Sequence, residues 1–307
     1  MNLKLDMPKF SVILPSYNGA GTLPACLENL NALARPVGGV EFIFVDNRSS
    51  DETGKLLAEA ATSLEGTFLY ERRPGKSYAL NAAIAEARGE YLIFTDDDTL
   101  VDSDWLIAYE KAAAEHLEIG VFAGQIRPYW LAKVPDWLDE LARRGQICGC
   151  TPADQKPGPY PFYWVKGANV MLRRSLFTDH AFDTDDVNFG SSAAAIGGED
   201  AKLMQDLVQA GEQIFHVPDA WLRHIVQPNE SKLSFILKRQ MRIGRGNAIV
   251  EGGGALAVVR KCVDILAYTL ITPFLFLLGK RASSFQQVMK IARRLGMLQV
   301  WATRNRR

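Results

Sequence analysis

The chain lacks the features that mark secreted and membrane-spanning proteins. Its N-terminus, MNLKLDMPKF, has no apolar segment of the kind that secretory signal peptides carry. An apolar run at residues 265–279 (ILAYTLITPFLFLLG) has 15 residues, fewer than the roughly 18–20 that a spanning helix needs. We therefore expect no secretory signal, and we expect this run to form an interfacial or re-entrant segment.

Cysteine is also scarce, with only four residues in the chain: Cys26, Cys148, Cys150 and Cys262. Cys148 and Cys150 have the spacing of half a metal site, but no second pair accompanies them. The sequence therefore predicts ordinary reduced thiols in a cytosolic chain. Internal repeats are absent as well.

The chain has no net excess of charge, since 35 Lys and Arg balance 35 Asp and Glu. The charges are unevenly spread, however. From Arg260 to the end there are 10 basic residues and one acid, Asp264 (10 − 1 = +9), which leaves 25 − 34 = −9 for the rest. An acidic body with a basic tail suggests an anionic partner for the tail. We expect that partner to be an anionic membrane surface and not nucleic acid.

Short apolar strands alternate with helical patterns in the first 100 residues. The four strands are predicted at residues 10–18, 40–47, 66–71 and 90–98. Such alternation is typical of a parallel, doubly wound α/β sheet. Ligands of these sheets bind beyond the carboxyl ends of the strands. Asp46 and Asp96–Asp98 lie at such ends, so we expect them to meet in one crevice.

Three consecutive carboxylates, Asp96–Asp98, end the fourth predicted strand, and three explanations compete for them. The first is a solvated turn in which Asp102 and Ser103 cap a helix that begins near Trp105. This explanation accounts for Asp102 and Asp104 but leaves the three carboxylates Asp96–Asp98 unexplained.

The second explanation is an aspartate-nucleophile phosphatase, because DDDTLVDS resembles the opening motif of the haloacid dehalogenases. That alignment puts Thr95 where the nucleophilic aspartate must be. The third is a site for a metal and a diphosphate. Asp96 and Asp98 point the same way on extended backbone, so one can hold a sugar hydroxyl and the other a hard divalent cation.

Five sequence blocks resemble family-2 glycosyltransferases of the GT-A fold in order and spacing. The blocks are SVILPSYNGAGTLPACL, FIFVDNRSSDET, GKSYALNAAIAEARGEYLIFTDDDT, WVKGANVMLRRSLF and GGEDAKLMQDLVQAG. The resemblance covers roughly residues 9–250. It implies a GT-A-like, doubly wound, mostly parallel sheet and the inverting transfer of a sugar from a nucleotide diphosphate, with Mg²⁺ or Mn²⁺.

The resemblance also implies a set of donor-binding residues. An aromatic residue after the first strand suits contact with a base, an acid after the second can hydrogen-bond it, and arginines suit a diphosphate. The family's Q-x-x-R-W block is replaced here by QMRIGRG, which lacks the tryptophan. The predicted donor-binding residues are Pro15, Tyr17, Asp46, Lys76, Asn81, Asp96, Asp97, Gly167, Asn169, Arg242 and Arg245.

The same resemblance implies the metal and catalytic residues. Asp98 is predicted as a metal ligand and His224 as a further one. Glu199 and Asp200 follow two glycines and open a helix. Inverting transfer needs one carboxylate to take the proton from the acceptor hydroxyl. We expect Asp200 to be this base and Glu199 to orient the acceptor or the base.

The sequence thus predicts a glycosyltransferase domain over residues 1–230 and a basic, apolar helical region over 231–307 that associates with a membrane. We expect a glycan or lipid-linked acceptor, in surface polysaccharide or lipid-linked glycan assembly, at the cytoplasmic face of the plasma membrane. Burial of 265–279 in the chain's own core or in a dimer interface is the alternative for the tail. The functional alternatives are a non-catalytic sugar-nucleotide or glycan-binding scaffold and a sugar nucleotidyltransferase. The latter needs a basic loop after the first strand, and PSYNGAGTLPACL has no basic residue.

Overall fold

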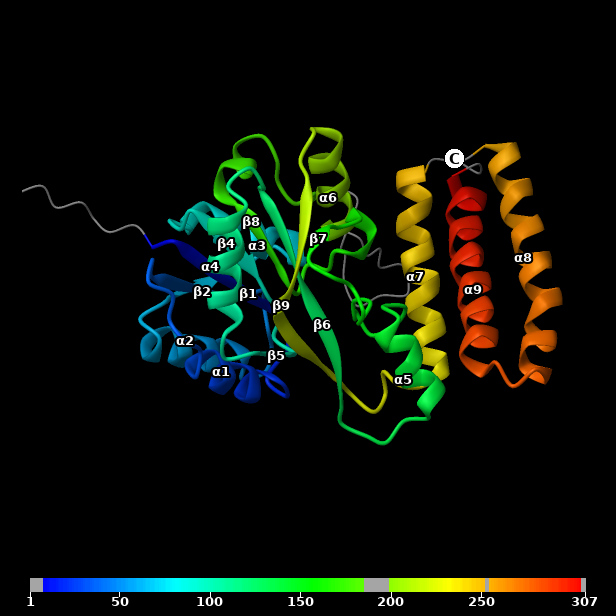
Figure 1. The fold of residues 1–307 in the computed structure, drawn as a ribbon, viewed down its shortest axis with the longest axis horizontal. Coiled ribbons are helices and arrows are strands. Elements are labelled where there is room, and N and C mark those ends of the chain that lie inside the picture. Colours follow the sequence, from blue (N-terminus) through cyan, green and yellow to red (C-terminus); the bar gives the residue numbers. More distant parts are fainter. Residues whose placement is uncertain (1–7, 185–198, 252–253, 305–307) are drawn as a thin grey trace, which may run out of the picture.

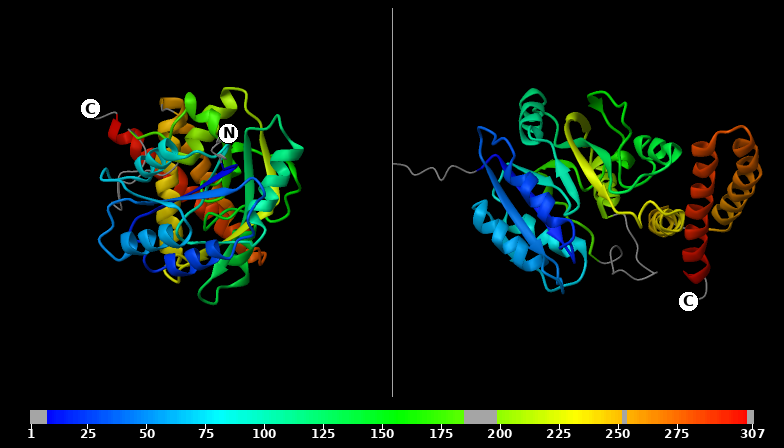
Figure 2. Two further views of the ribbon diagram at one scale, coloured as in Figure 1. Left: turned by 90° about the vertical axis from the view of Figure 1, so that its left-hand side faces the viewer. Right: turned by 90° about the horizontal axis from the view of Figure 1, so that it is seen from below.

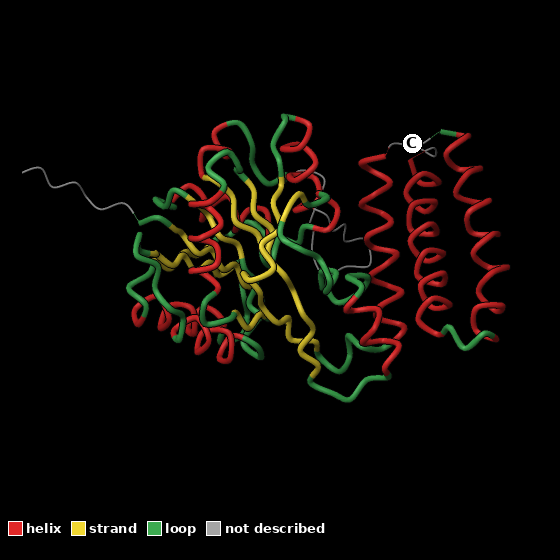
Figure 3. Tube along the Cα trace, in the orientation of Figure 1, coloured by secondary structure: helices red, strands yellow, loops and turns green. Residues whose placement is uncertain are grey.

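A computed structural model describes residues 8–184, 199–251 and 254–304 of the chain. One nine-stranded sheet forms the centre of its first part, in the order β3-β2-β1-β4-β8-β6-β9-β5, with β7 paired to β9. Figure 3 shows strands only in this part of the chain, whereas the C-terminal part consists of helices.

The first half of the sheet is parallel and follows the predicted alternation. Its strands are β1 (Phe10–Ser16), β2 (Val40–Asp46), β3 (Thr67–Tyr70) and β4 (Tyr91–Phe94). Ser16 pairs with Asp46, and Ile13 pairs with Phe94. The carboxyl ends of β1, β2 and β4 therefore meet at one edge, as predicted.

The second half of the sheet is mixed. Its strands are β5 (Thr99–Val101), β6 (Val121–Trp130), β7 (Gly158–Pro159), β8 (Val170–Arg173) and β9 (Ile214–Val226). β8 runs antiparallel to both β4 and β6, and β9 runs parallel to β6 but antiparallel to β5. The β5–β9 pairing carries the end of β9 to the segment that follows β4.

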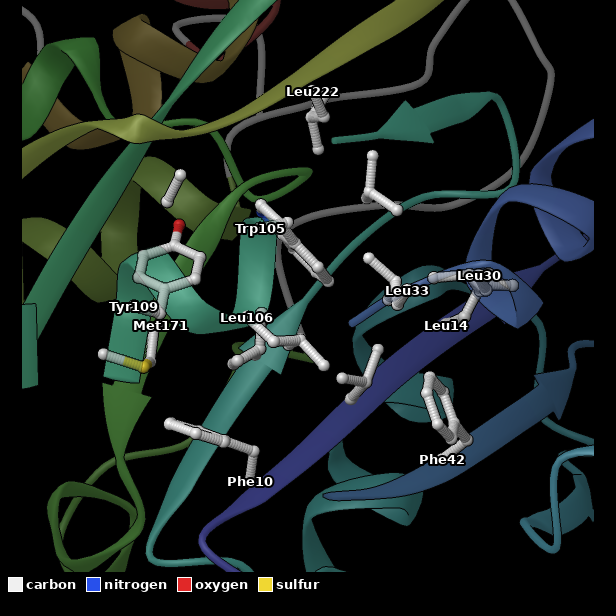
Figure 4. Close-up of a cluster of buried hydrophobic side chains, with 14 of the residues drawn as sticks. Phe10, Leu14, Leu30, Leu33, Phe42, Trp105, Leu106, Tyr109, Met171 and Leu222 are labelled. Atoms are coloured by element: carbon white, nitrogen blue, oxygen red, sulfur yellow. The ribbon is translucent and has the colours of Figure 1, made fainter. Parts of the chain in front are cut away.

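Helices cover both faces of the sheet. The helices α1 (Leu23–Asn31), α2 (Thr53–Ser63) and α4 (Trp105–Glu115) pack on one face, and α3 (Lys76–Glu86) and α6 (Glu199–Gln209) pack on the other. Alternate residues of each strand point to opposite faces. Phe10 and Leu14 of β1 thus pack with Trp105 in the first core (Figure 4), whereas Ile13 packs in the second. The fold is doubly wound, as expected.

The segment between β6 and β8 holds the short helix α5 (Asp136–Arg143) and the 3₁₀ turn η1 (Phe162–Trp164). A second 3₁₀ turn, η2 (Arg174–Thr178), follows β8. The rest of the segment contributes the two-residue strand β7 to the edge of the sheet.

Three long helices make up the C-terminal part, namely α7 (Leu233–Glu251), α8 (Ala255–Leu277) and α9 (Arg281–Arg304). α9 lies between α7 and α8 (Figure 1), and the right-hand view of Figure 2 shows the three helices beside the sheet domain. A Cβ on Gly244 would lie 2.0 Å from the Arg293 carbonyl oxygen, so α7 and α9 touch backbone to backbone.

One hydrophobic cluster joins this part to the rest of the chain, because Leu138 and Leu141 of α5 pack with Ile236 of α7 and with Met289 of α9. The division into domains at residue 230 therefore stays a prediction. None of the described helices has both the length and the apolar character needed to cross a membrane.

Candidate functional site

A cleft of about 310 Å³ opens beyond the carboxyl ends of β1 and β4. Tyr17 lies at its mouth with 57% of its surface exposed, and Asp97 and Asp98 line it. Glu230, after β9, and Phe235, at the start of α7, close it from the other side. The cleft therefore combines an accessible aromatic ring with carboxylates, as predicted for the end of the parallel strands.

The first two aspartates after β4 have different partners. Asp96 forms an ion pair with Lys76 at the start of α3. Asp97 accepts a hydrogen bond from the hydroxyl group of Ser16 at the end of β1. Three predicted donor-binding residues are thus brought together, and two of them already neutralise each other's charge.

The third aspartate, Asp98, pairs with His224. Its Oδ2 atom lies 3.0 Å from Nε2 of His224. The pairing of β5 with β9 sets this contact, because Thr99 lies opposite His224, and the Ile225 amide donates to the Asp98 carbonyl oxygen at 2.7 Å. The second oxygen of the carboxylate, Oδ1, is buried and has no hydrogen-bond partner among the described residues.

Burial and the neighbouring charges shift the pKa values of Asp97, Asp98 and His224. Burial, and then the charge of Asp98, raises the pKa of Asp97 to about 7. Burial is the largest influence on Asp98 and acts in the same direction, but the hydrogen bond from His224 and the charges of His224, Lys76 and Arg239 together outweigh it and lower the pKa of that carboxyl. Burial is also the largest influence on His224, where it acts to lower the pKa, but the hydrogen bond to Asp98 and the charge of Asp98 together outweigh it and raise the pKa. Negative charge is therefore concentrated on Asp98.

Three other predicted donor-binding residues are engaged within the fold. The side-chain nitrogen of Asn81 donates to the carbonyl oxygen of Phe182 at 2.8 Å, and Oδ1 of Asn81 accepts from the Phe182 amide at 3.0 Å. Asp46 is only 4% exposed and accepts a hydrogen bond from the Ser49 amide at 2.9 Å. Pro15 is buried within β1 and does not line the cleft. Asn81 thus braces the loop at Phe182.

Asn47, which follows Asp46, is a positioning residue that the sequence did not reveal. Its side chain donates to the carbonyl oxygen of Arg73 at 2.7 Å and accepts from the Gly75 amide at 2.9 Å. These bonds hold the turn that leads into Lys76. An asparagine directly after a strand is a signal for such a turn, because its side chain readily bonds to backbone groups.

Asn169 corrects a prediction, because its side chain is 1% exposed and fully engaged. Its Oδ1 atom accepts hydrogen bonds from Trp105 (2.9 Å) and Tyr109 (2.8 Å). Its amide nitrogen donates to the carbonyl oxygens of Gln125 (3.0 Å) and Ala220 (2.9 Å). A side chain with all these bonds is not available to a donor, so Asn169 instead ties α4, β6 and β9 to the turn before β8.

Asp200 lies against the turn that contains Gly167. The Gly167 amide donates to Oδ2 of Asp200 at 3.0 Å, and the Ala201 amide donates to Oδ1 at 2.8 Å. A Cβ on Gly167 would lie 3.3 Å from the Cβ of Asp200, which is a tight contact. Two predicted site residues are thus brought together. Glu199 is the first residue of α6, and its side chain lies outside the described part of the structure.

The model of the family described as "Glycosyl transferase family 2" matches residues 11–188, which is more than half of the chain. The chain belongs to glycosyl transferase family 2. This membership excludes the aspartate-nucleophile phosphatase, whose nucleophile position is occupied here by Thr95. The Thr95 hydroxyl is buried and lies 2.8 Å from that of Thr99.

Two curated relatives of this family-2 chain carry names that refer to glycan synthesis. The succinoglycan biosynthesis protein ExoM of Rhizobium meliloti is 26% identical over 66% of this chain and 62% of its own length. The poly(ribitol-phosphate) beta-glucosyltransferase of Bacillus spizizenii is 30% identical over 35% of this chain and 18% of its own length. The chain therefore spans less than two thirds of each relative.

Solved structures share the fold. A mannosyltransferase of Pyrobaculum calidifontis in complex with GDP-Man and Mn²⁺ matches with a TM-score of 0.65 and 21% identity, over 95% of this chain and 87% of that one. Staphylococcus aureus TarS in complex with UDP-GlcNAc matches with a TM-score of 0.51 and 19% identity, over 76% of this chain and 65% of that one. The predicted family and the GT-A-like α/β fold are confirmed.

The arginines of α7 in this family-2 chain are placed differently from the prediction. Arg242 is exposed, Arg245 donates to Gln299 of α9 at 3.4 Å, and neither lines the cleft. Arg239 is the arginine of α7 whose charge acts on both Asp98 and His224.

Proposed function

We propose that this chain is a metal-dependent, inverting glycosyltransferase that moves a sugar from a nucleotide-diphosphate donor to a hydroxyl group of an acceptor. The observation that carries the proposal is Asp98, which presents an unpaired buried carboxylate oxygen at the carboxyl end of β4, in the cleft that Tyr17 borders. This is where ligands of doubly wound sheets bind.

The residues at the cleft fit a hard cation such as Mg²⁺ or Mn²⁺. An unpaired buried carboxylate oxygen costs free energy unless a charge compensates it, and these cations prefer carboxylate and phosphate oxygens. Among the described residues, no group of three or more His, Cys, Asp or Glu side chains is arranged to hold a metal. Asp98 would therefore hold the ion together with phosphate oxygens of the donor. His224 would orient Asp98, and its role as a direct ligand stays a prediction.

Asp200 is proposed as the general base. It takes the proton from the acceptor hydroxyl while that oxygen bonds to the anomeric carbon of the donor sugar. The bond from this carbon to the diphosphate oxygen breaks, and its electron pair leaves with the diphosphate. Attack opposite the leaving group inverts the anomeric centre. The cation, when bound, supplies the positive charge that stabilises the departing diphosphate, so the chain needs no general acid.

Substrates are proposed from the relatives. The two solved neighbours are complexes with GDP-Man and with UDP-GlcNAc, so we infer that the donor here is also a nucleotide sugar. The curated relatives are named for succinoglycan biosynthesis and for glucosylation of poly(ribitol-phosphate). These names support a role in the synthesis of a bacterial polysaccharide or a lipid-linked glycan.

A panel of nucleotide sugars, measured by thermal shift with and without Mn²⁺, tests this function. One nucleotide should raise the melting temperature in the presence of Mn²⁺, because a ligand that binds only the native state stabilises it. The same nucleotide should have little effect in EDTA. If no nucleotide sugar stabilises the chain in the presence of Mn²⁺, the proposed function is wrong.

The α8 helix supports membrane attachment. Seven apolar side chains at helical spacing form a stripe along its outer side, each at least 57% exposed: Leu256, Val259, Val263, Leu266, Leu270, Phe274 and Leu277. This exposure contradicts the alternative in which residues 265–279 pack into the chain's own core. Large apolar patches of this kind mark interaction surfaces, and α8 lies at the outer edge of the molecule (Figure 1).

We propose an anionic membrane surface as the occupant of this stripe. Arg260, Lys280 and Arg281 lie near the apolar run and are exposed. Each such cation near an anionic surface contributes about 1 kcal/mol of attraction, and the stripe adds burial at the acyl boundary. A helix held in this way lies on the membrane and does not cross it.

Flotation with liposomes tests the attachment. The wild-type chain should float with anionic vesicles, less so at high salt, whereas Leu266→Gln/Leu270→Gln/Phe274→Gln should remain unbound. The melting temperature of this triple variant should not fall, because the three side chains are 60–69% exposed. Leu117→Gln, at a position 71% exposed on the sheet domain, is the matched control and should float like wild type.

Equal flotation of the wild type and the triple variant would contradict the membrane surface. A change from dimer to monomer in the triple variant, measured by light scattering, would assign the stripe to a dimer interface instead.

A further inference from the structure

Two arginines lie side by side on neighbouring strands of the sheet. Arg127 of β6 is the register partner of Arg223 of β9. The residues that precede them, Ile126 and Leu222, pack in the first core, so both arginines point to the opposite face. Neighbouring strands lie about 5 Å apart, and like charges directly opposite each other across two strands are destabilising. We call Arg127 and Arg223 the arginine pair.

Each member of the arginine pair is stacked on an aromatic ring of the other strand. The guanidinium carbon of Arg127 lies 4.4 Å from the centre of the Trp221 ring, and that of Arg223 lies 5.0 Å from the centre of the Tyr129 ring. Both rings are two residues away in the register, in opposite directions, so the two cationic side chains lean apart along the strands. Stacking uses the flat side of a guanidinium group and leaves the N–H donors at its edge for an oxyanion.

The arginine pair lacks a counter-charge in the part of the chain that the structure describes. Within residues 8–184, 199–251 and 254–304, neither arginine has a carboxylate oxygen within 4.0 Å. The Nε atom of Arg223 is buried and has no hydrogen-bond partner among these residues. A buried donor without a partner costs free energy, which a bound anion would offset. The arginine pair is therefore suited to a carboxylate or phosphate group, which arginine binds through two parallel hydrogen bonds.

Trp221 also lines a hollow of about 400 Å³ between β9 and α4. The other residues that line the hollow are Asp102, Asp104, Ile107, Ala108, Lys111 and Asp219. Its volume is within the range of small-molecule sites. Carboxylates accept hydrogen bonds from hydroxyl groups, and an indole ring offers a large apolar surface with a polar edge. This combination suits a sugar, which has both hydroxyl groups and apolar C–H groups.

We propose that the arginine pair and the hollow form a second binding site, for a saccharide that carries one anionic substituent. The anionic group binds to the arginine pair, and the hydroxyl groups of the sugar bind to the carboxylates of the hollow. Asp102, Asp104 and Asp219 disfavour a polyanion such as nucleic acid or an anionic membrane surface, because they would repel its further charges.

The second site is separate from the metal cleft. The side chain of His224 contacts Asp98, and successive residues of a strand point to opposite faces, so Arg223 points away from that contact. Among the described residues, those that line the cleft and those of the second site do not overlap. The second site thus goes beyond the proposed function, because binding there needs neither the donor nor a cation.

Titration of the full chain with charged sugars, followed by NMR of the tryptophan indole N–H groups, tests the second site without donor or metal. The chain has six tryptophans, and the variant Trp221→Phe identifies the signal of Trp221. This signal should shift with glucuronate or with glucose 6-phosphate, and the stronger of the two shows whether the anionic group is a carboxylate or a phosphate. Glucose and inorganic phosphate should each bind at least about tenfold more weakly, because each lacks one half of the interaction.

Matched variants locate the effect on the arginine pair. Arg127→Gln and Arg223→Gln should each weaken binding of the charged sugar by about tenfold or more, the usual effect of losing a charged hydrogen bond. Because Arg127 is exposed, its variant should keep the melting temperature of wild type. Arg35→Gln is the control, because Arg35 is an exposed arginine that also stacks on an aromatic ring, 4.8 Å from the centre of Phe42. It should bind the charged sugar like wild type.

Two results would overturn the proposal: no shift of the Trp221 signal with either charged sugar, or equal affinity in wild type and both Gln variants. Equal affinity of wild type for glucose would leave the arginine pair without a role, and equal affinity for inorganic phosphate would leave the hollow without one, so each would also overturn it. Failure of the proposed function is a different result, namely that wild type binds no nucleotide sugar with Mn²⁺ while a charged sugar still shifts the Trp221 signal.

Discussion

Asp200→Asn is expected to lower kcat by at least about 10²-fold, the usual contribution of a general base, and to leave donor affinity unchanged. Asparagine has nearly the same shape, and its one carbonyl oxygen can still accept the hydrogen bond from the Gly167 amide, which lies 3.0 Å from Oδ2, while the bond from the Ala201 amide to Oδ1 is lost. The substitution therefore removes basicity and keeps the turn in place. Turnover would be measured as release of the nucleoside diphosphate, and donor affinity by calorimetry with Mn²⁺.

Two further substitutions on α6 test which carboxylate acts as the base. Asp206→Asn removes a carboxylate that pairs with Lys202 on the helix surface, and it should retain wild-type turnover. Glu199→Gln tests the neighbouring acid. Retained turnover in Asp200→Asn together with loss in Glu199→Gln would move the role of base to Glu199. Retained turnover in both would contradict a catalytic carboxylate here, and absent turnover even in wild type would favour the scaffold.

The architecture of the sheet was predictable because its signals are local. Short apolar strands followed by helical periodicity set the parallel half, β1 to β4. In a parallel sheet the carboxyl ends of adjacent strands must lie at one edge, so the placement of the ends of β1, β2 and β4 at one edge followed without knowledge of any contact. The family blocks then extended the prediction to the turn at Gly167 and to Asp200.

The partners of individual side chains were not predictable, because they depend on which distant strands pair. Asp98 meets His224 because β5 pairs with β9, and the Asn169 side chain is engaged because residues of α4, β6 and β9 meet around it. The positions of the arginines of α7 relative to the cleft were not predictable for a similar reason. The face of α7 that turns toward the cleft is fixed by the packing of α7 on α9, where Gly244 lies against Arg293.

For the C-terminal helices, the amino-acid composition indicated a kind of partner but not how the helices pack. The basic, apolar character of the tail predicted an anionic partner, but it did not distinguish a membrane surface from burial. The position of α9 between α7 and α8 decides which side of α8 is covered.

Asp98→Asn is expected to weaken the binding of the nucleotide in Mn²⁺ by at least about 10²-fold, because a metal ion contributes several kcal/mol to charge stabilisation at such a site. EDTA should reduce the affinity of wild type to a similar level. The fold should be kept, since asparagine can still bond to His224 and since the charge that acts on Asp97 is removed.

Asp104→Asn is the matched control for this experiment, because Asp104 is an exposed carboxylate of the same segment and its side chain makes no capping hydrogen bond to α4. It should bind the nucleotide like wild type, with the same dependence on Mn²⁺. Calorimetry that finds equal nucleotide affinity in wild type and Asp98→Asn, with and without EDTA, would show that the carboxylate does not hold a cation. The unpaired Oδ1 atom of Asp98 would then need another partner. The negative charge at the end of β4 would have to be balanced by cationic side chains instead. In the described structure, Lys76 and Arg239 are the lysine and arginine whose charges act on Asp98.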